Sequence, residues 1–258
     1  DENAFTTSYS YDPAGRLQTI AYPGADTNAW YPTTTSFSRR DIDEHGLAAG
    51  HWMQSTVTGN RAKNIFLDAL WRPVLTHEWD GTDLAGTLRT TATRYDDQNR
   101  PVFTSYPSAT TSASTQGVHT EYDALGRTTL VKQDSELGQL KTQTEYLPQL
   151  LTRVTNPRLQ QTVTLFRAFD QPSYDVPVGI VSPEGIATEL HRDLFGAIQM
   201  VKRRNGDGSM QAVRQYLYDG HHRLCKSIEP ETGATVVDYD AAGNVAWSAS
   251  GVAAPSDP

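Results

Sequence analysis

The chain has almost no cysteine, no long hydrophobic run and no excess of positive charge. Cys225 is the only cysteine among 258 residues, so no disulfide can form within the chain. No run approaches the ~18 apolar residues of a transmembrane helix, so we expect no membrane span. The formal charge is −8, with 30 acidic and 22 basic residues. Because nucleic-acid binding needs clustered positive charge, we expect no nucleic-acid partner.

Hydrophobic residues are also scarce for a folded chain of this length. They make up 37% of the residues, and the mean hydropathy is −0.54. Such a composition favours a thin sheet that is apolar on one face over a single thick core. No amphipathic helical pattern stands out, which directs the interpretation towards strands.

A short phrase recurs along the chain. Residues 11–16 read YDPAGR, residues 122–127 read YDALGR, and looser copies are YDDQNR at 95–100, YDGHHR at 218–223 and YDAAGN at 239–244. Weaker copies begin at Ile42, Leu67, Phe169 and Arg192. Their aspartates are 21 to 31 residues apart, with one gap of 47 in which Tyr146 is read as an eroded copy. The chain is therefore an array of about nine to ten degenerate units.

Each column of the repeat has a physical reason. Aspartate suits the first position of a type I turn, because its carboxylate accepts a backbone N–H two residues on. The residue three positions after the aspartate is expected to have positive φ, which suits glycine and, next best, asparagine or histidine. Arginine at the following position can reach back to the aspartate or lie over the preceding tyrosine ring. Trp71 breaks the glycine column, so we expect a different turn there. The residues assigned to these structural turns are Tyr11, Asp12, Gly15, Arg16, Tyr95, Asp96, Asn99, Arg100, Tyr122, Asp123, Gly126, Arg127, Tyr218, Asp219, Arg223, Tyr239, Asp240 and Gly243.

The flanks of the turns alternate between apolar and polar residues as strands do. Each unit thus predicts a strand, a tight turn, a second strand and a connection to the next unit. The fold class is all-β: an antiparallel array of hairpins over 1–250, with a flexible tail at 251–258. Residues 107–119 are expected to form a loop. The first strand near 5–11 and the last near 245–249 have few charges and no proline, so we expect adhesive edges there.

The YD units at Tyr11 and Tyr122 resemble the signature of the Rhs/YD-repeat family, and the resemblance covers roughly residues 5–250. In bacterial toxin complexes, polymorphic toxins and the animal teneurins, such repeats form a β-sheet strip that spirals into a hollow shell. In the bacterial proteins the shell sequesters a C-terminal toxin. The resemblance implies a curved sheet strip or part of a spiral β-shell, in a secreted or cell-surface protein. Its implied partners are the remaining repeats of a longer parent chain and an enclosed toxin or other cargo.

Two departures limit what the resemblance implies. Family shells have many more repeats than this chain, which favours a fragment of the repeat region. The chain also lacks the Asp-Pro-x-Gly-Leu segment that supports autoproteolytic release of cargo in bacterial shells. The resemblance therefore implies shell construction but not cargo release.

No set of residues predicts catalysis, a metal site or a cofactor. His77-Glu78 begins a zinc-binding pattern that fails, because Gly81 stands where the second histidine belongs. Residues 41–46 imitate a calcium loop, but position twelve is Trp52 and not the required glutamate. The cluster of His221, His222 and Cys225 has no evident fourth ligand for zinc.

We therefore expect a non-catalytic structural scaffold that forms a segment of a shell. The alternative is a binding module for carbohydrate or a cell-surface protein, which would use exposed aromatic residues of the same sheet. Tryptophan stacks well on sugars but more often packs a sheet face or a turn. The tryptophans in question are Trp30, Trp52, Trp71, Trp79 and Trp247.

Overall fold

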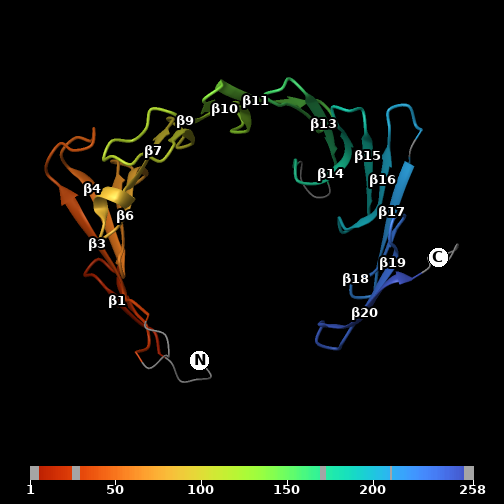
Figure 1. The fold of residues 1–258 in the computed structure, drawn as a ribbon, viewed down its shortest axis with the longest axis horizontal. Helices are drawn as coiled ribbons and strands as arrows, with labels where there is room; N and C mark the ends of the chain where they lie inside the picture. The colour runs from red at the N-terminus through yellow and green to blue at the C-terminus, as the bar shows by residue number, and fades with distance from the viewer. Residues whose placement is uncertain (1–5, 25–29, 169–172, 210, 253–258) are drawn as a thin grey trace. The chain divides into compact units, whose positions relative to one another are not determined.

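The structure, a computed structural model, describes residues 6–24, 30–168, 173–209 and 211–252. The chain divides into two compact units, residues 1–140 and residues 141–258. Both units are built from antiparallel strands that follow one another in chain order (Figure 1). The prediction of an all-β fold made of antiparallel hairpins is confirmed.

The first unit is a meander in which each strand pairs with the next strand of the sequence. Its strands are β1 (Ser8–Tyr11), β2 (Leu17–Ala21), β3 (Thr33–Arg40), β4 (His51–Thr58), β5 (Arg61–Leu67), β6 (Pro73–Asp80), β7 (Arg89–Tyr95), β8 (Pro101–Ser105), β9 (Gly117–Tyr122) and β10 (Thr128–Ser135). One short helix, α1 (Leu84–Thr87), lies in the β6–β7 connection. The Asp83 side chain caps it by accepting the N–H of Gly86.

The second unit repeats this arrangement. Its strands are β11 (Gly138–Leu147, which begins in the first unit), β12 (Leu151–Thr155), β13 (Gln161–Phe166), β14 (Pro177–Val181), β15 (Ala187–Arg192), β16 (Ile198–Arg204), β17 (Gln211–Tyr218), β18 (Leu224–Glu229), β19 (Gly233–Tyr239) and β20 (Val245–Val252). Within each meander, the described turns that lead from an odd-numbered strand to the next even-numbered one lie at the same end of the strands.

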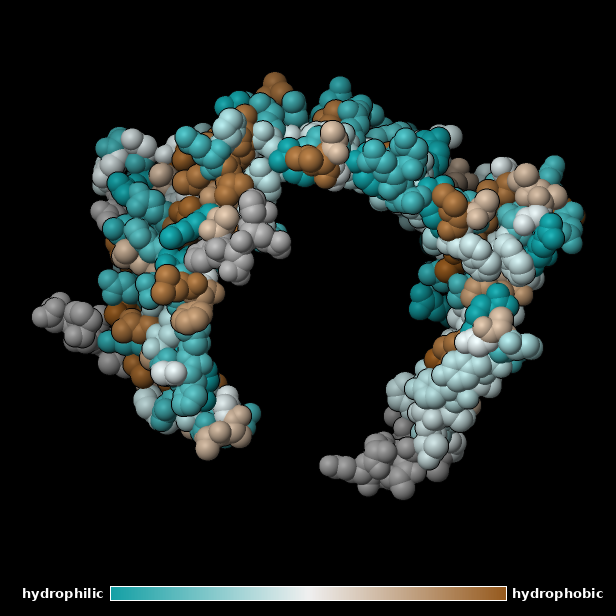
Figure 2. Space-filling view, turned by 180° about the vertical axis from the view of Figure 1, so that it is seen from behind, coloured by the Kyte–Doolittle hydropathy of each residue, from teal (hydrophilic) through white to brown (hydrophobic). Residues whose placement is uncertain are grey.

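Each unit is a single layer. Among the described residues, strands contact their sheet neighbours and no strand packs face to face on another. Few apolar side chains of the described residues are buried, as the low hydrophobic share predicts: Ala62, Phe66, Leu67, Leu75, Leu88, Phe103 and Ala234. On the face shown in Figure 2, hydrophobic residues form small patches among hydrophilic ones.

The thickest part of the first unit lies over β5 to β8. There the loop of residues 106–116 folds back on the sheet: His77 Nε2 lies 3.2 Å from the carbonyl oxygen of Thr111, and Thr90 exchanges backbone hydrogen bonds with Ser108. The expected loop at 107–119 is therefore shorter than predicted, because β9 begins at Gly117. No described helix is long and apolar enough to span a membrane. Of the expected tail at 251–258, the first two residues belong to β20 and the others lie outside the described residues.

Candidate functional site at the junction between hairpins

The aspartate turns share one set of hydrogen bonds. At Asp12, the carboxylate oxygen Oδ1 accepts the backbone N–H of Ala14 and of Arg16, both at 2.9 Å, and the Asp12 carbonyl accepts the N–H of Gly15. The aspartate thus satisfies three backbone donors of a five-residue turn. The same three bonds occur at Asp68, Asp96, Asp123, Asp193, Asp219 and Asp240.

The fourth residue of each turn has the positive φ that the sequence predicts. The values are 77° at Gly15, 65° at Asn99, 80° at Gly126, 63° at His222 and 86° at Gly243. A residue in this conformation adds a bulge that matches the twist of the two strands.

Trp71 corrects one expectation, since a different turn was predicted there. It adopts φ 62° in the same turn as the glycines. Its ring stacks on Trp52, with ring centroids 5.4 Å apart and planes inclined by 25°. The aspartate bonds and this stacking together hold a bulky residue in a conformation that it rarely adopts.

The arginine after the turn binds the aspartate of its own turn. Its Nε donates to the aspartate Oδ2 at 2.7 or 2.8 Å in the units of Arg16, Arg72, Arg100, Arg127 and Arg223. The effect on the acid is largest at Asp219. There the backbone N–H and then the side chain of Arg223 lower the pKa of the carboxyl to about 2. The turn aspartate is therefore ionised at neutral pH.

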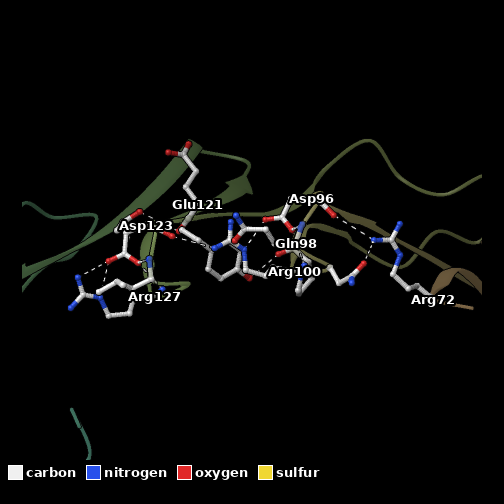
Figure 3. A network of polar contacts seen from close by, with 12 residues as sticks. Arg72, Asp96, Gln98, Arg100, Glu121, Asp123 and Arg127 are labelled. Carbon is white, nitrogen blue, oxygen red and sulfur yellow. Dashed lines mark hydrogen bonds and ion pairs between the residues drawn. The ribbon is translucent and has the colours of Figure 1, made fainter. Parts of the chain in front are cut away.

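The same guanidinium also contacts the following unit, as Figure 3 shows for Arg72 with Asp96 and for Arg100 with Asp123. Its carbon Cζ lies 4.7 Å from the ring centroid of Tyr95 for Arg72 and 4.6 Å from that of Tyr122 for Arg100. Nη1 of Arg100 also donates to the carbonyl of Asp123 at 3.2 Å. The predicted contact with the aspartate is present, but the ring that the arginine covers belongs to the next unit and not to its own.

The tyrosine hydroxyl makes a second contact between consecutive hairpins. We call the arginine contact and this tyrosine contact together the junction. The hydroxyl donates to the backbone carbonyl five residues after the preceding aspartate, at 2.9 or 3.0 Å. The pairs are Tyr95 with Pro73, Tyr122 with Pro101, Tyr218 with Ile198 and Tyr239 with Leu224. At Tyr95, Tyr122 and Tyr239, the junction therefore combines a cation–π contact made by the preceding arginine with a hydrogen bond that the tyrosine donates back to the preceding hairpin.

The register of these junctions is constant. The residue seven positions after one aspartate pairs with the residue four positions before the next aspartate. The four pairs are Leu75 with Ala92, Phe103 with His119, Met200 with Gln215 and Lys226 with Val236. The number of residues between these aspartates varies although the register does not. The difference in length therefore falls in the connections at the other end of the strands, away from the aspartate turns.

One junction in the second unit uses a substitute for arginine. Ala197 occupies the arginine position after Asp193. His222 of the following unit instead places Nε2 2.7 Å from Asp193 Oδ2 and stacks on the ring of Tyr218. Asp193 is partly desolvated, which raises its pKa, but the hydrogen bonds from His222 and the turn lower it overall. At the last turn, Asn244 replaces arginine and donates to Asp240 Oδ2 at 3.3 Å.

The weak copy at Ile42 does not form an aspartate turn at Asp43. The carboxylate of Asp43 accepts the N–H of Ala49, and the reversal of the chain occurs further on, between Glu44 and Leu47. The aromatic position of this unit is Phe37, whose ring centroid lies 4.4 Å below Cζ of Arg16. This hairpin is longer than the others, so its tip lies beyond the position that the repeat predicts.

The other weak copies differ in outcome. Those at Leu67 and Arg192 precede true aspartate turns. The copy at Phe169 lies outside the described residues. After Tyr146 the chain does reverse as expected, but through Gln149 and Leu150, both with positive φ, and without an aspartate.

Two turns with the same backbone hydrogen bonds were missed, at the opposite end of the strands; only the one at Asn156 also has the side-chain bonds. Asn156 Oδ1 accepts the N–H of Arg158 and of Gln160, and Ser182 begins a turn that Gly185 closes. Each is followed by proline, a dipeptide that favours turn initiation. That signal could have found them.

The described residues contain no group of three or more side chains that could hold a metal ion. In the cluster singled out from the sequence, His222 binds Asp193, and Cys225 Sγ contacts the carbonyl of Leu217 at 3.4 Å. An open hollow of about 690 Å³ lies beside β7 to β10. Its charged side chains are engaged with partners: Arg100 with Asp96, Lys132 with Glu121, and Arg94 over Phe103.

No protein-family model and no curated protein sequence matches the chain. Among solved structures, "Crystal Structure of TcdB2-TccC3-TEV" is similar over 96% of this chain and 14% of that chain, with a TM-score of 0.55 and 13% identity. A TccC3-containing Tc holotoxin pore of Photorhabdus luminescens matches 96% of this chain and 18% of its own, with a TM-score of only 0.32 and 12% identity. The chain thus spans a small part of these proteins. Its hairpin array has the fold of a segment of the TcdB2–TccC3 chain, which supports the resemblance to YD-repeat shells.

Proposed function

We propose that this chain is a non-catalytic wall segment of a YD-repeat shell, and that the shell encloses a polypeptide cargo such as a toxin. The observation that carries the proposal is the repeated junction. Consecutive hairpins are joined by the arginine contact and the tyrosine hydrogen bond at Tyr95, Tyr122 and Tyr239, and each unit remains one layer thick within the described residues. A layer built in this way separates two compartments with little material.

The composition of the site also supports a structural role. The repeated aspartates and arginines have a structural use. In the turns, the aspartates bind backbone N–H groups and the arginine side chains. The partners in this proposal are the remaining repeats of a longer chain and the enclosed cargo, in a secreted or cell-surface protein.

Small-angle scattering tests the wall. A compact protein of this length has a radius of gyration of about 18 Å. We expect a clearly larger value, because neither unit adds a second layer to its sheet within the described residues. A value near that of a compact protein would overturn the proposal.

Limited proteolysis tests the enclosure. The chain is expressed together with the polypeptide encoded around it. An enclosed segment should resist cleavage in buffer and become sensitive at the urea concentration that unfolds the repeats. Equal cleavage rates with and without urea would rule out enclosure while leaving the wall intact.

A second candidate, a carbohydrate-binding module, rests on one observation. Trp71 is 50% exposed and stacks on Trp52, which gives a flat aromatic surface of the kind that binds sugar rings. Glycan-array binding that is lost in Trp71→Ala, but retained in Trp79→Ala, would favour this module. Absence of glycan binding would leave the wall segment as the function.

A further inference from the structure

Four neighbouring strands of the first unit bring basic and aromatic side chains into one row. Arg94 of β7 pairs with Phe103 of β8, which pairs with His119 of β9. His119 in turn pairs with Lys132 of β10. Because directly paired residues lie on the same face of a sheet, the four side chains are neighbours. All four line the open hollow of about 690 Å³ beside these strands, a volume within the range of about 300–1,000 Å³ that is usual for ligand sites.

Arg94 lies over an aromatic ring, but its N–H donors are not used within the described part of the chain. Its Cζ lies 4.2 Å from the ring centroid of Phe103, which is only 5% exposed, whereas Arg94 is exposed. No described residue accepts a hydrogen bond from this guanidinium. The other described arginines of the first unit pair with a carboxylate or donate to a backbone carbonyl: Arg16, Arg39, Arg40, Arg61, Arg72, Arg89, Arg100 and Arg127. Arg94 is therefore held in place by a buried ring while its donor edges stay open.

The charges around the hollow favour a ligand with a single negative charge. Two ion pairs line it, each neutral as a whole: Arg100 with Asp96 and Lys132 with Glu121. Arg94 then leaves one positive charge without a carboxylate partner among the described residues. The edge of a guanidinium presents parallel N–H groups that fit the two oxygens of a carboxylate. A dianionic phosphate fits less well, because the Glu121 carboxylate in the same hollow is 54% exposed and would repel it.

We infer that this hollow binds a carboxylate carried by a polypeptide, and that Arg94 holds it through two parallel N–H···O bonds. Phe103 fixes the guanidinium beforehand, so less freedom is lost on binding. The hollow is much larger than one carboxylate, which leaves room for the residues beside it. The carboxylate can belong to an aspartate or glutamate side chain or to a chain terminus. The site lies within one unit and needs neither a closed wall nor an enclosed cargo, so it can be present where the proposed function fails.

An NMR titration of the full chain tests the ligand, with the Arg94 Nε–H and the His119 backbone N–H as readouts. The probe is a hexapeptide of glycine and serine with one central glutamate, blocked at both ends. We expect weak, saturable shifts that the blocked glutamine counterpart does not produce. The glutamine peptide with a free carboxyl terminus separates the two sources, and binding of either carboxylate supports the inference. Equal binding of the two blocked peptides, or tighter binding of a phosphoserine counterpart, would overturn it.

Substitutions test the role of Arg94, with the His119 backbone N–H as the readout. Arg94→Gln should weaken binding of the glutamate peptide about tenfold. Arg94→Lys should recover only part of this loss, because lysine keeps the charge but not the paired donors. The matched control is Arg89→Gln, which removes the same charge from an exposed position of the same strand outside the hollow. That variant should keep the affinity of the parent.

A gain of binding cannot be explained by misfolding. Glu121→Gln removes a competing carboxylate and releases the Lys132 ammonium, so binding should strengthen about two- to fivefold. Asp41→Asn removes the same charge at an exposed position of the same unit and should leave the affinity nearly unchanged. Unchanged affinity in both Arg94→Gln and Glu121→Gln, or an equal gain in Asp41→Asn, would overturn the inference.

Discussion

Replacing Gly126 by valine isolates the conformational demand of the aspartate turn. Gly126 has φ 80°, and a Cβ placed on it would have Arg100 Nη1 as its nearest neighbour, at 3.8 Å. Because that distance is an ordinary contact, the substitution creates no clash. The whole cost arises from holding a β-branched residue in the left-handed region.

The expected magnitude follows from that conformation. An L-residue in the left-handed region costs about 1–2 kcal/mol, and branching at Cβ adds to it, so we expect a loss of about 2 kcal/mol. With an m value of about 2 kcal/mol/M in urea, the unfolding midpoint falls by about 1 M. Tryptophan fluorescence is a suitable assay, because the first unit contains Trp30, Trp52, Trp71 and Trp79 and the second only Trp247.

Two controls make the result interpretable. Gly24→Val makes the same change in the same unit at a glycine outside the left-handed region, with open space around it, and should be nearly neutral. Gly126→Asn should cost less than valine, because Asn99 already occupies the equivalent position with φ 65°. A parent-like midpoint for Gly126→Val would refute the turn geometry. An equal loss in Gly24→Val would show that the left-handed conformation is not the cause.

Three further predictions concern single polar groups. Tyr122→Phe removes the hydrogen bond to the Pro101 carbonyl and should destabilise the first unit by about 1 kcal/mol, whereas Tyr11→Phe, measured at low protein concentration, should be neutral; equal losses would contradict the junction. Because the pKa of Asp219 is lowered to about 2, its stabilisation is complete above about pH 4 and is lost as the pH falls towards 2; circular dichroism of the second unit should show this, and Asp219→Asn should flatten the profile. Burial lowers the pKa of His77, so the first unit should lose stability as the pH falls below about 6.5, and an unchanged urea midpoint between pH 7 and 5, or the same slope in His77→Asn, would contradict this.

The surroundings of His77 determine whether the first unit gains or loses stability as the pH falls. Burial of the ring lowers its pKa most, the Thr111 carbonyl raises it, and the nearby His45 and Glu44 act in opposite directions. The ring centroids of His45 and His77 are 4.7 Å apart, and Phe66 packs against both. Protonation would therefore place a charge in the thickest apolar part of the unit.

The local chemistry of the turns was predictable from sequence. Aspartate, glycine and arginine act within five consecutive residues, so their columns carry the geometry directly, as Asp12, Gly15 and Arg16 show. The fold class follows from the same columns and from the alternating flanks. The turn at Trp71 was mispredicted because its stability depends on stacking with Trp52, a residue on another strand.

The junction itself could not be predicted, because it joins residues of different hairpins. The repeat shows that Tyr122 recurs before an aspartate, but only the strand register shows that its hydroxyl reaches Pro101 and its ring lies under Arg100. The hairpin of β3 and β4 illustrates the same limit. Phe37 replaces tyrosine there, and the aspartate that seemed to anchor the unit, Asp43, accepts the N–H of Ala49 further along the same connection.

The single-layer meander has a mechanical consequence. In each unit, successive strands are bonded side by side and the chain crosses from one to the next only at the edges. A force applied to the two ends of a unit would load the hydrogen bonds of its outermost strand first, and not those of all strands together. Each hairpin is tied mainly to its neighbours, so we expect such a unit to peel one strand at a time under low force. The same sheet would strongly resist a force directed along its strands, because sliding would break every bond of a junction at once.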